Sequence, residues 1–142
     1  MAYWLMKTEP DAYSWQELVR TGRGTWDGVR NYAARNHMRA MKVGDRVAIY
    51  HSNQGKEIVG IAEIVREAFQ DPTTDDVRWS AVEVAPLRAL QRPVPLTTLK
   101  AEHAAGGDLG ELEMLRQGRL SVVPLREREW RRILQLGETT LE

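Results

Sequence analysis

The residues best suited to chemistry lie in the stretch TWDGVRNYAARNHMRAM, residues 25–41. Trp26 lies on a glycine-containing turn, and amide and guanidinium side chains follow it closely. A planar ligand such as a nucleobase needs an aromatic surface for stacking and Asn or Arg groups to read its edge. The stretch therefore predicts a site for a planar, hydrogen-bonding ligand. Its polar and aromatic side chains after the turn are Arg30, Asn31, Tyr32, Arg35, Asn36 and Arg39.

The charge of the chain is unevenly distributed. Its net charge is zero, which argues against a generic nucleic-acid-binding protein, because such proteins are usually basic. Residues 20–46, however, contain seven basic and two acidic residues, and the balancing acids lie elsewhere, for example in residues 71–76. This basic segment is either a solvated helix face or a surface that contacts phosphates.

The sequence lacks the residues that several kinds of catalytic site require. There is no cysteine, the three histidines have no metal-ligand spacing, and the glycines fit neither a phosphate-binding loop nor a dinucleotide fingerprint. We therefore expect no metal and no bound cofactor. Lys7 and Glu9, with Ser52, leave acid–base catalysis open, but ligand binding by these side chains is the favoured interpretation.

Length and composition predict the general class. A chain of 142 residues suits a single domain, residues 1–142. The sequence contains no run of about eighteen apolar residues, which a membrane-spanning helix would need, and its first residues do not resemble a secretion signal. We therefore expect a cytoplasmic protein without a membrane partner. No exposed apolar strip is evident, so a monomer is expected.

Tryptophan is unusually frequent, with five residues against one phenylalanine. Trp4 and Trp130 occur in apolar patterns and are predicted to lie in the core. Trp15 begins a predicted helix, and Trp79 lies on a predicted strand without a clear role. Trp26 lies in a polar, glycine-rich segment, which fits either a loop anchor that plugs the core or a ring that stacks on a ligand.

The elements that must position these residues follow from hydrophobic periodicity and caps. Residues 22–28 should form a loop, and the prolines at 93 and 95 should end the fourth strand. The order predicts an α+β domain built on a strongly bent or barrel-like sheet. Strands are expected over residues 3–6, 46–50, 56–66, 78–90 and 120–123. Helices are expected over residues 14–20, 31–41, 96–105, 111–116 and 125–136.

Four blocks of the sequence resemble those of the EVE domain: KTEP at 7–10, WDGVRNYAARN at 26–36, YHSN at 50–53 and RLSV at 119–122. The similarity extends from residue 3 to about residue 136, with the blocks in order. The EVE domain is a PUA-like family related to YTH and ASCH domains. The resemblance implies a small, bent β-barrel of five or six strands surrounded by short helices.

The resemblance also implies binding rather than catalysis. Related domains hold a modified base in a pocket: YTH domains bind methylated adenine in RNA, and EVE domains are linked to modified cytosine in DNA. The expected partner is therefore modified DNA or RNA. Two alternatives stay open, namely a hydrolase that acts on a modified nucleoside, as in some ASCH relatives, and a small-molecule-sensing or protein-interaction module.

The resemblance further implies which side chains form the site. Trp26 would form a wall of the pocket. Glu9, Asn31 and Ser52 are expected to hydrogen-bond the base edge, and the basic side chains to contact phosphate or set the electrostatics of the pocket. The implied base-binding residues are Lys7, Glu9, Trp26, Arg30, Asn31, Tyr32, Arg35, Asn36, His51, Ser52, Asn53 and Ser121.

Overall fold

Residues 1–141, the part of the chain that the computed structural model describes, form six strands and five helices. Within this range no helix is both long and apolar enough to cross a membrane. The strands are β1 (Tyr3–Thr8), β2 (Gly24–Trp26), β3 (Arg46–His51), β4 (Glu57–Gln70), β5 (Ser80–Pro95) and β6 (Val122–Leu125). The helices are α1 (Trp15–Thr21), α2 (Tyr32–Ala40), α3 (Leu96–Ala105), α4 (Glu113–Arg116) and α5 (Glu127–Leu136).

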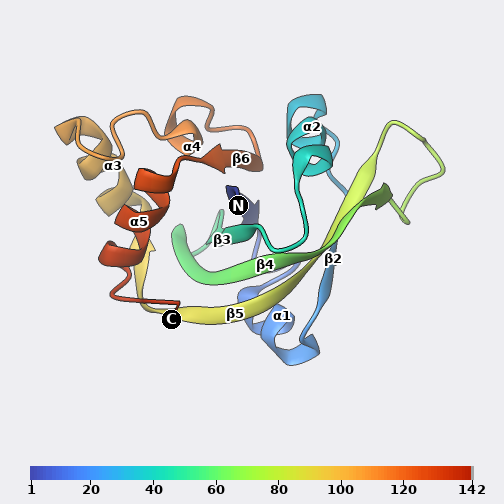
Figure 1. Ribbon diagram of the computed structural model, residues 1–142, viewed down its shortest axis with the longest axis horizontal. Helices are drawn as coiled ribbons and strands as arrows, with labels where there is room; N and C mark the ends of the chain where they lie inside the picture. Colours follow the sequence, from blue (N-terminus) through green and yellow to red (C-terminus); the bar gives the residue numbers. More distant parts are fainter. Residues whose placement is uncertain (142) are drawn as a thin grey trace.

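All six strands form one mixed sheet in the order β2-β5-β4-β3-β1-β6. Only β1 and β3 pair in parallel, and the other pairs are antiparallel. Figure 1 shows β4 and β5 as two long, curved strands that run together across the molecule. The predicted α+β class and bent sheet are confirmed, but no strand pair between residues 1 and 141 joins β2 to β6, so the sheet is not closed.

The sheet separates two hydrophobic cores. Alternate side chains of a strand point to opposite faces, so Trp4 and Met6 enter the first core and Leu5 enters the second. The first core also contains side chains of α1 and α2, whereas the second contains side chains of α3, α4 and α5. These last three helices gather at one end of the molecule in Figure 1. Trp4 and Trp130 are buried as predicted.

Three element boundaries differ from the prediction. The expected loop at residues 22–28 contains β2, which pairs with β5 along only three residues. The fifth strand continues to Pro95, because Pro93 falls in a register shift where it pairs with no β4 residue. The sixth strand extends through Pro124, which an edge strand tolerates because one of its sides needs no donor.

The spacing Ser14-x-x-Glu17 predicts a capping box, in which each side chain bonds to the backbone of the other residue, and only half of this box forms at α1. The Ser14 hydroxyl accepts a hydrogen bond from the Glu17 amide at 3.0 Å, which confirms the helix start. The Glu17 carboxylate, however, pairs with Arg20 rather than reaching back to the Ser14 amide. The helix ends at Gly22, whose positive φ of 76° suits a left-handed cap.

Gly60 of β4 lies against the ring of Trp15. A Cβ atom at this position would meet the indole at 2.5 Å, and the ring is buried in the first core. We expect Gly60→Ala to lower the free energy of unfolding by about 1–3 kcal/mol, because overpacking forces the ring or the strand to shift. Urea denaturation would measure this effect. Gly107→Ala, where nothing lies within 4 Å, is the control, and equal stability of the two variants would contradict the packing argument.

Candidate functional site

A cavity of about 550 Å³ opens at the carboxyl end of β1 and brings together five of the predicted site residues. These five are Lys7, Glu9, Trp26, Arg30 and Ser121. The volume lies within the range of ligand pockets. The other lining residues are Thr8, Ala12, Tyr13, Thr25, Asp27, Gly28 and Val29. We call this space the base cavity.

The end of β1 is held on both sides by backbone hydrogen bonds. The Lys7 amide donates to the Ser121 carbonyl at 2.8 Å, and the Ser52 amide donates to the Thr8 carbonyl at 2.8 Å. These bonds join three sequence blocks that are far apart along the chain. The loop after β2 supplies the opposite wall, beginning with Trp26.

Two aromatic rings border the base cavity. Trp26 is only 7% exposed and belongs to the first core, as a ring that anchors its loop would, and it also lines the cavity. Tyr13 meets it edge to face, with ring centroids 6.0 Å apart and an interplanar angle of 80°. Sequence reasoning missed Tyr13, whose only signal is its place directly before the Ser14 cap.

Asp71 holds the loop that forms the second wall. Its carboxylate is fully buried and accepts hydrogen bonds from the Gly28 amide at 2.8 Å and from the Arg30 guanidinium at 2.9 Å. Thr73 donates to the other oxygen through its amide and hydroxyl. Burial alone would raise the pKa of Asp71, but these hydrogen bonds outweigh it and lower the pKa to about 2. The acidic segment 71–76 predicts an exposed loop, and this prediction is wrong at Asp71, which is fully buried.

Charged groups of both signs surround the base cavity. Partial desolvation, and then the neighbouring Asp71 carboxylate, raise the pKa of Asp27. Partial burial lowers the pKa of Lys7, whose ammonium donates to the Gly118 carbonyl at 2.9 Å. With Glu9 and Arg30, the cavity therefore offers both hydrogen-bond acceptors and donors beside its aromatic rings.

The predicted residues of α2 lie outside the base cavity, and two of them, Tyr32 and Arg35, belong to a half-buried aromatic cluster. Tyr32 is 50% exposed and stacks on Trp79, with ring centroids 5.1 Å apart. The Arg35 guanidinium lies 5.0 Å from the Tyr32 ring centre, and Arg78 donates to the Tyr32 hydroxyl at 3.0 Å. The cluster therefore joins α2 to the loop between β4 and β5.

The two predicted asparagines of this segment serve local structure. Asn31 caps α2, because its side-chain oxygen accepts from the Ala34 amide at 3.0 Å. The Asn36 side-chain oxygen accepts from Arg35. Neither asparagine lines the base cavity. The amide oxygen of Asn31 is thus already occupied within the helix cap.

The YHSN block, residues 50–53, spans the end of β3 and divides between two places. His51 is buried, and its Nε2 accepts a hydrogen bond from the Trp15 amide at 3.0 Å, so it braces the start of α1. Burial lowers the pKa of His51, which favours the neutral ring that this bond requires. Ser52 and Asn53 line a different cavity, one that shares Lys7 with the base cavity.

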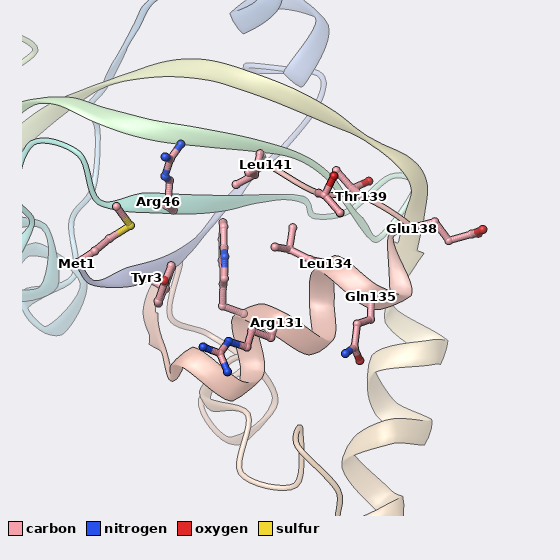
Figure 2. A pocket seen from close by; sticks show the side chains of 11 residues that line it. Met1, Tyr3, Arg46, Arg131, Leu134, Gln135, Glu138, Thr139 and Leu141 are labelled. Carbon is pink, nitrogen blue, oxygen red and sulfur yellow. The ribbon is translucent and has the colours of Figure 1, made fainter.

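A third cavity, of about 590 Å³, contains none of the predicted residues. Figure 2 shows it between the sheet and α5. Tyr3 and Trp130 stack within it, with ring centroids 4.9 Å apart. This third cavity is slightly larger than the base cavity, but no residue of the four sequence blocks lines it. Its lining comes largely from α5 and the residues after α5.

Comparison with known proteins identifies the family. Residues 2–136 match the EVE domain. Mouse thymocyte nuclear protein 1 is 40% identical, over 96% of this chain and 74% of its own length. A Rhodopseudomonas palustris protein solved by NMR has a TM-score of 0.89 and 44% identity, covering 97% of this chain and 94% of its own. The crystal structure of human THYN1 in complex with DNA containing 5-methylcytosine has a TM-score of 0.90 and 35% identity, covering 99% of each chain. This chain therefore belongs to the EVE domain family.

Proposed function

We propose that this EVE domain binds DNA that contains a modified cytosine and holds the modified base in the base cavity. The observation that supports the proposal is the lining of that cavity, where two aromatic rings meet carboxyl and basic groups. The human relative in complex with DNA containing 5-methylcytosine supports the choice of DNA and of cytosine.

The lining suits the edge of cytosine. The exocyclic amine of cytosine donates hydrogen bonds, and a carboxylate is the usual side chain that accepts from it. Asp27 and Glu9 are the two carboxyl groups that line the cavity. A methyl group on the base, buried against Tyr13 or Val29, would contribute about 0.8 kcal/mol, which corresponds to about fourfold tighter binding.

A base inside a duplex must be turned out before it can enter such a cavity. Unstacking and unpairing cost a few kcal/mol, so contacts to the phosphates have to offset this cost. Arg30 and Lys7 supply positive charge at the cavity itself. The arginines beside Tyr32 extend this charge along α2, away from the base.

Asp27→Asn tests the proposal. The affinity of a labelled duplex with one 5-methylcytosine, and of the same duplex with cytosine, would be measured by fluorescence anisotropy. The parent protein should bind the methylated duplex about fourfold more tightly. Asp27→Asn should weaken binding of both by about tenfold, because a charged acceptor is lost.

The matched control is Asp75→Asn, an exposed acid that does not line the base cavity. It should leave both affinities unchanged. Equal affinity of the parent protein for the two duplexes would contradict base recognition. Equal effects of the Asp27 and Asp75 substitutions would contradict the assignment of the cavity.

One observation favours a second candidate, a hydrolase that acts on a modified nucleoside. The lowered pKa of Lys7 in the same cavity is a property that a lysine general base requires. Chromatography of a panel of modified nucleosides after incubation with the protein would reveal turnover, which Lys7→Gln should abolish. RNA as the ligand, a cytoplasmic location and a monomeric state stay predictions from the sequence.

A further inference from the structure

Three of the four lysines of the chain line one cavity of about 310 Å³. Lys7 comes from the end of β1, Lys56 directly precedes β4, and Lys100 lies on α3. Among residues 1–141, no acidic residue lines this space, which we call the lysine cavity. The remaining lining residues are Tyr50, Ser52, Asn53, Leu96, Met114, Leu115 and Gly118.

The positive charge of the lysine cavity has no internal partner. Every ion pair found within residues 1–141 uses an arginine, so none of the three lysines pairs with a carboxylate there. The ammonium group of Lys7 donates only to a backbone carbonyl, that of Gly118. Three uncompensated cations around a concave space attract an anion.

The backbone around the lysine cavity adds to this preference. The first turn of α3 borders the cavity, and no side chain caps this helix end, so its positive dipole end is available. The Leu96 amide donates to the Lys56 carbonyl at 2.8 Å, which ties this end of the helix to the turn before β4. In that turn Asn53 and Lys56 adopt positive φ angles of 69° and 48°, conformations that are costly for residues other than glycine.

The lysine cavity and the base cavity meet at one residue. Lys7 lines both, at the carboxyl end of β1. Residues lining the base cavity include Trp26 and Val29 of the first core, whereas the lysine cavity includes Tyr50 and Met114 of the second core. The two spaces therefore lie on opposite sides of the sheet and adjoin each other at the carboxyl end of β1.

We propose that Lys7, Lys56 and Lys100 bind a phosphate group in the lysine cavity, next to the base cavity. The phosphate has the same chemistry whether it belongs to a DNA strand or to a free nucleotide. Only the link to a base rests on the function proposed above. Ser52 and Asn53 provide further polar groups around the anion, which gives Ser52 a phosphate role instead of the predicted base-edge role.

The test removes two charges without touching the base cavity. Lys56 and Lys100 are both exposed and line only the lysine cavity, so the double variant K56Q/K100Q should fold as the parent does. K42Q is the matched control, because Lys42 is the fourth lysine, is exposed and lines neither cavity. Circular dichroism melting would verify the fold of both variants.

Calorimetry would compare 5-methyl-deoxycytidine 5′-monophosphate with its nucleoside. The parent protein and K42Q should bind the nucleotide about tenfold more tightly than the nucleoside, and K56Q/K100Q should remove this difference. For a methylated duplex, the slope of log affinity against log salt should become shallower by about one in K56Q/K100Q, as expected for one lost phosphate contact. If K56Q/K100Q loses affinity for the nucleotide but not for the duplex, the ligand is a free phosphate. If it loses affinity for the nucleotide and the duplex, the site also binds the DNA backbone.

A duplex with an abasic site in place of the modified cytosine separates the two proposals. Suppose that K56Q/K100Q binds the abasic duplex more weakly than the parent does, and that neither the parent nor any variant distinguishes methylated from unmethylated DNA. The phosphate site then stands and base recognition fails. An unchanged nucleotide preference and salt slope in K56Q/K100Q would overturn the phosphate site, even if methylated DNA is preferred. Equal weakening of nucleoside and nucleotide would overturn it as well.

Discussion

Trp26→Ala is expected to lower the free energy of unfolding by about 3–5 kcal/mol, as truncation of a buried tryptophan usually does. Trp26 is 7% exposed and packs in the first core against Tyr13. Weaker DNA binding by Trp26→Ala would therefore not by itself assign a binding role to the ring. Urea denaturation of the variant would measure the loss.

Trp26→Phe separates binding from stability at this position. It keeps an apolar ring but withdraws part of the aromatic surface, so affinity for methylated DNA should fall about fivefold, with a smaller loss of stability. Trp130→Phe is the matched control, because Trp130 is 4% exposed and lies in the second core away from the base cavity. Equal losses of affinity in both variants would show that Trp26 affects binding only through the fold.

Asp71→Asn is expected to lower the free energy of unfolding at pH 7 by about 2 kcal/mol. The folded-state pKa of Asp71 is about 2, against an ordinary value of 3.8, so folding favours its carboxylate. This stabilisation is complete above about pH 4 and is lost progressively as the pH falls from about 4 to about 2. The free energy of unfolding of Asp71→Asn should therefore approach that of the parent as the pH falls through this window.

Urea denaturation at a series of pH values would measure this convergence. Asp75→Asn, at an exposed position in the same loop, should follow the parent at every pH. A constant difference between the parent and Asp71→Asn from pH 7 to pH 2 would contradict the ionised state of Asp71. Since Asp71 also holds Gly28 and Arg30, the variant should bind methylated DNA more weakly at neutral pH.

The sequence predicted the elements whose cause is local. The Ser14 cap needs only a residue three positions away, and β1 and β3 follow from short apolar runs that mark buried strands. The order of the EVE-like blocks also placed Lys7, Glu9 and Trp26 at one site. These features depend on short segments, so they can be predicted without the three-dimensional structure.

The sequence was least informative where a local pattern allows two structural outcomes. Helical spacing showed which side of α2 is apolar, but it did not show what faces the other side. The fold turns Tyr32 and Arg35 towards Trp79 and Arg78 rather than into the base cavity. The prediction that β5 ends before Pro95 was also wrong. A register shift in the pairing of β4 with β5 leaves Pro93 without a partner, so the strand continues to Pro95.

Only the tertiary structure decided which distant residues complete the two cavities. Asp71 lies 43 positions from Gly28, and no periodicity in the sequence connects a loop acid with that amide. The three lysines at positions 7, 56 and 100 converge because β1, β4 and α3 meet at one end of the sheet. The sequence by itself determined the family, the α+β class and the residues at the end of β1. Long-range strand pairing and packing determined their charged partners, because such contacts depend on register and not on neighbouring residue types.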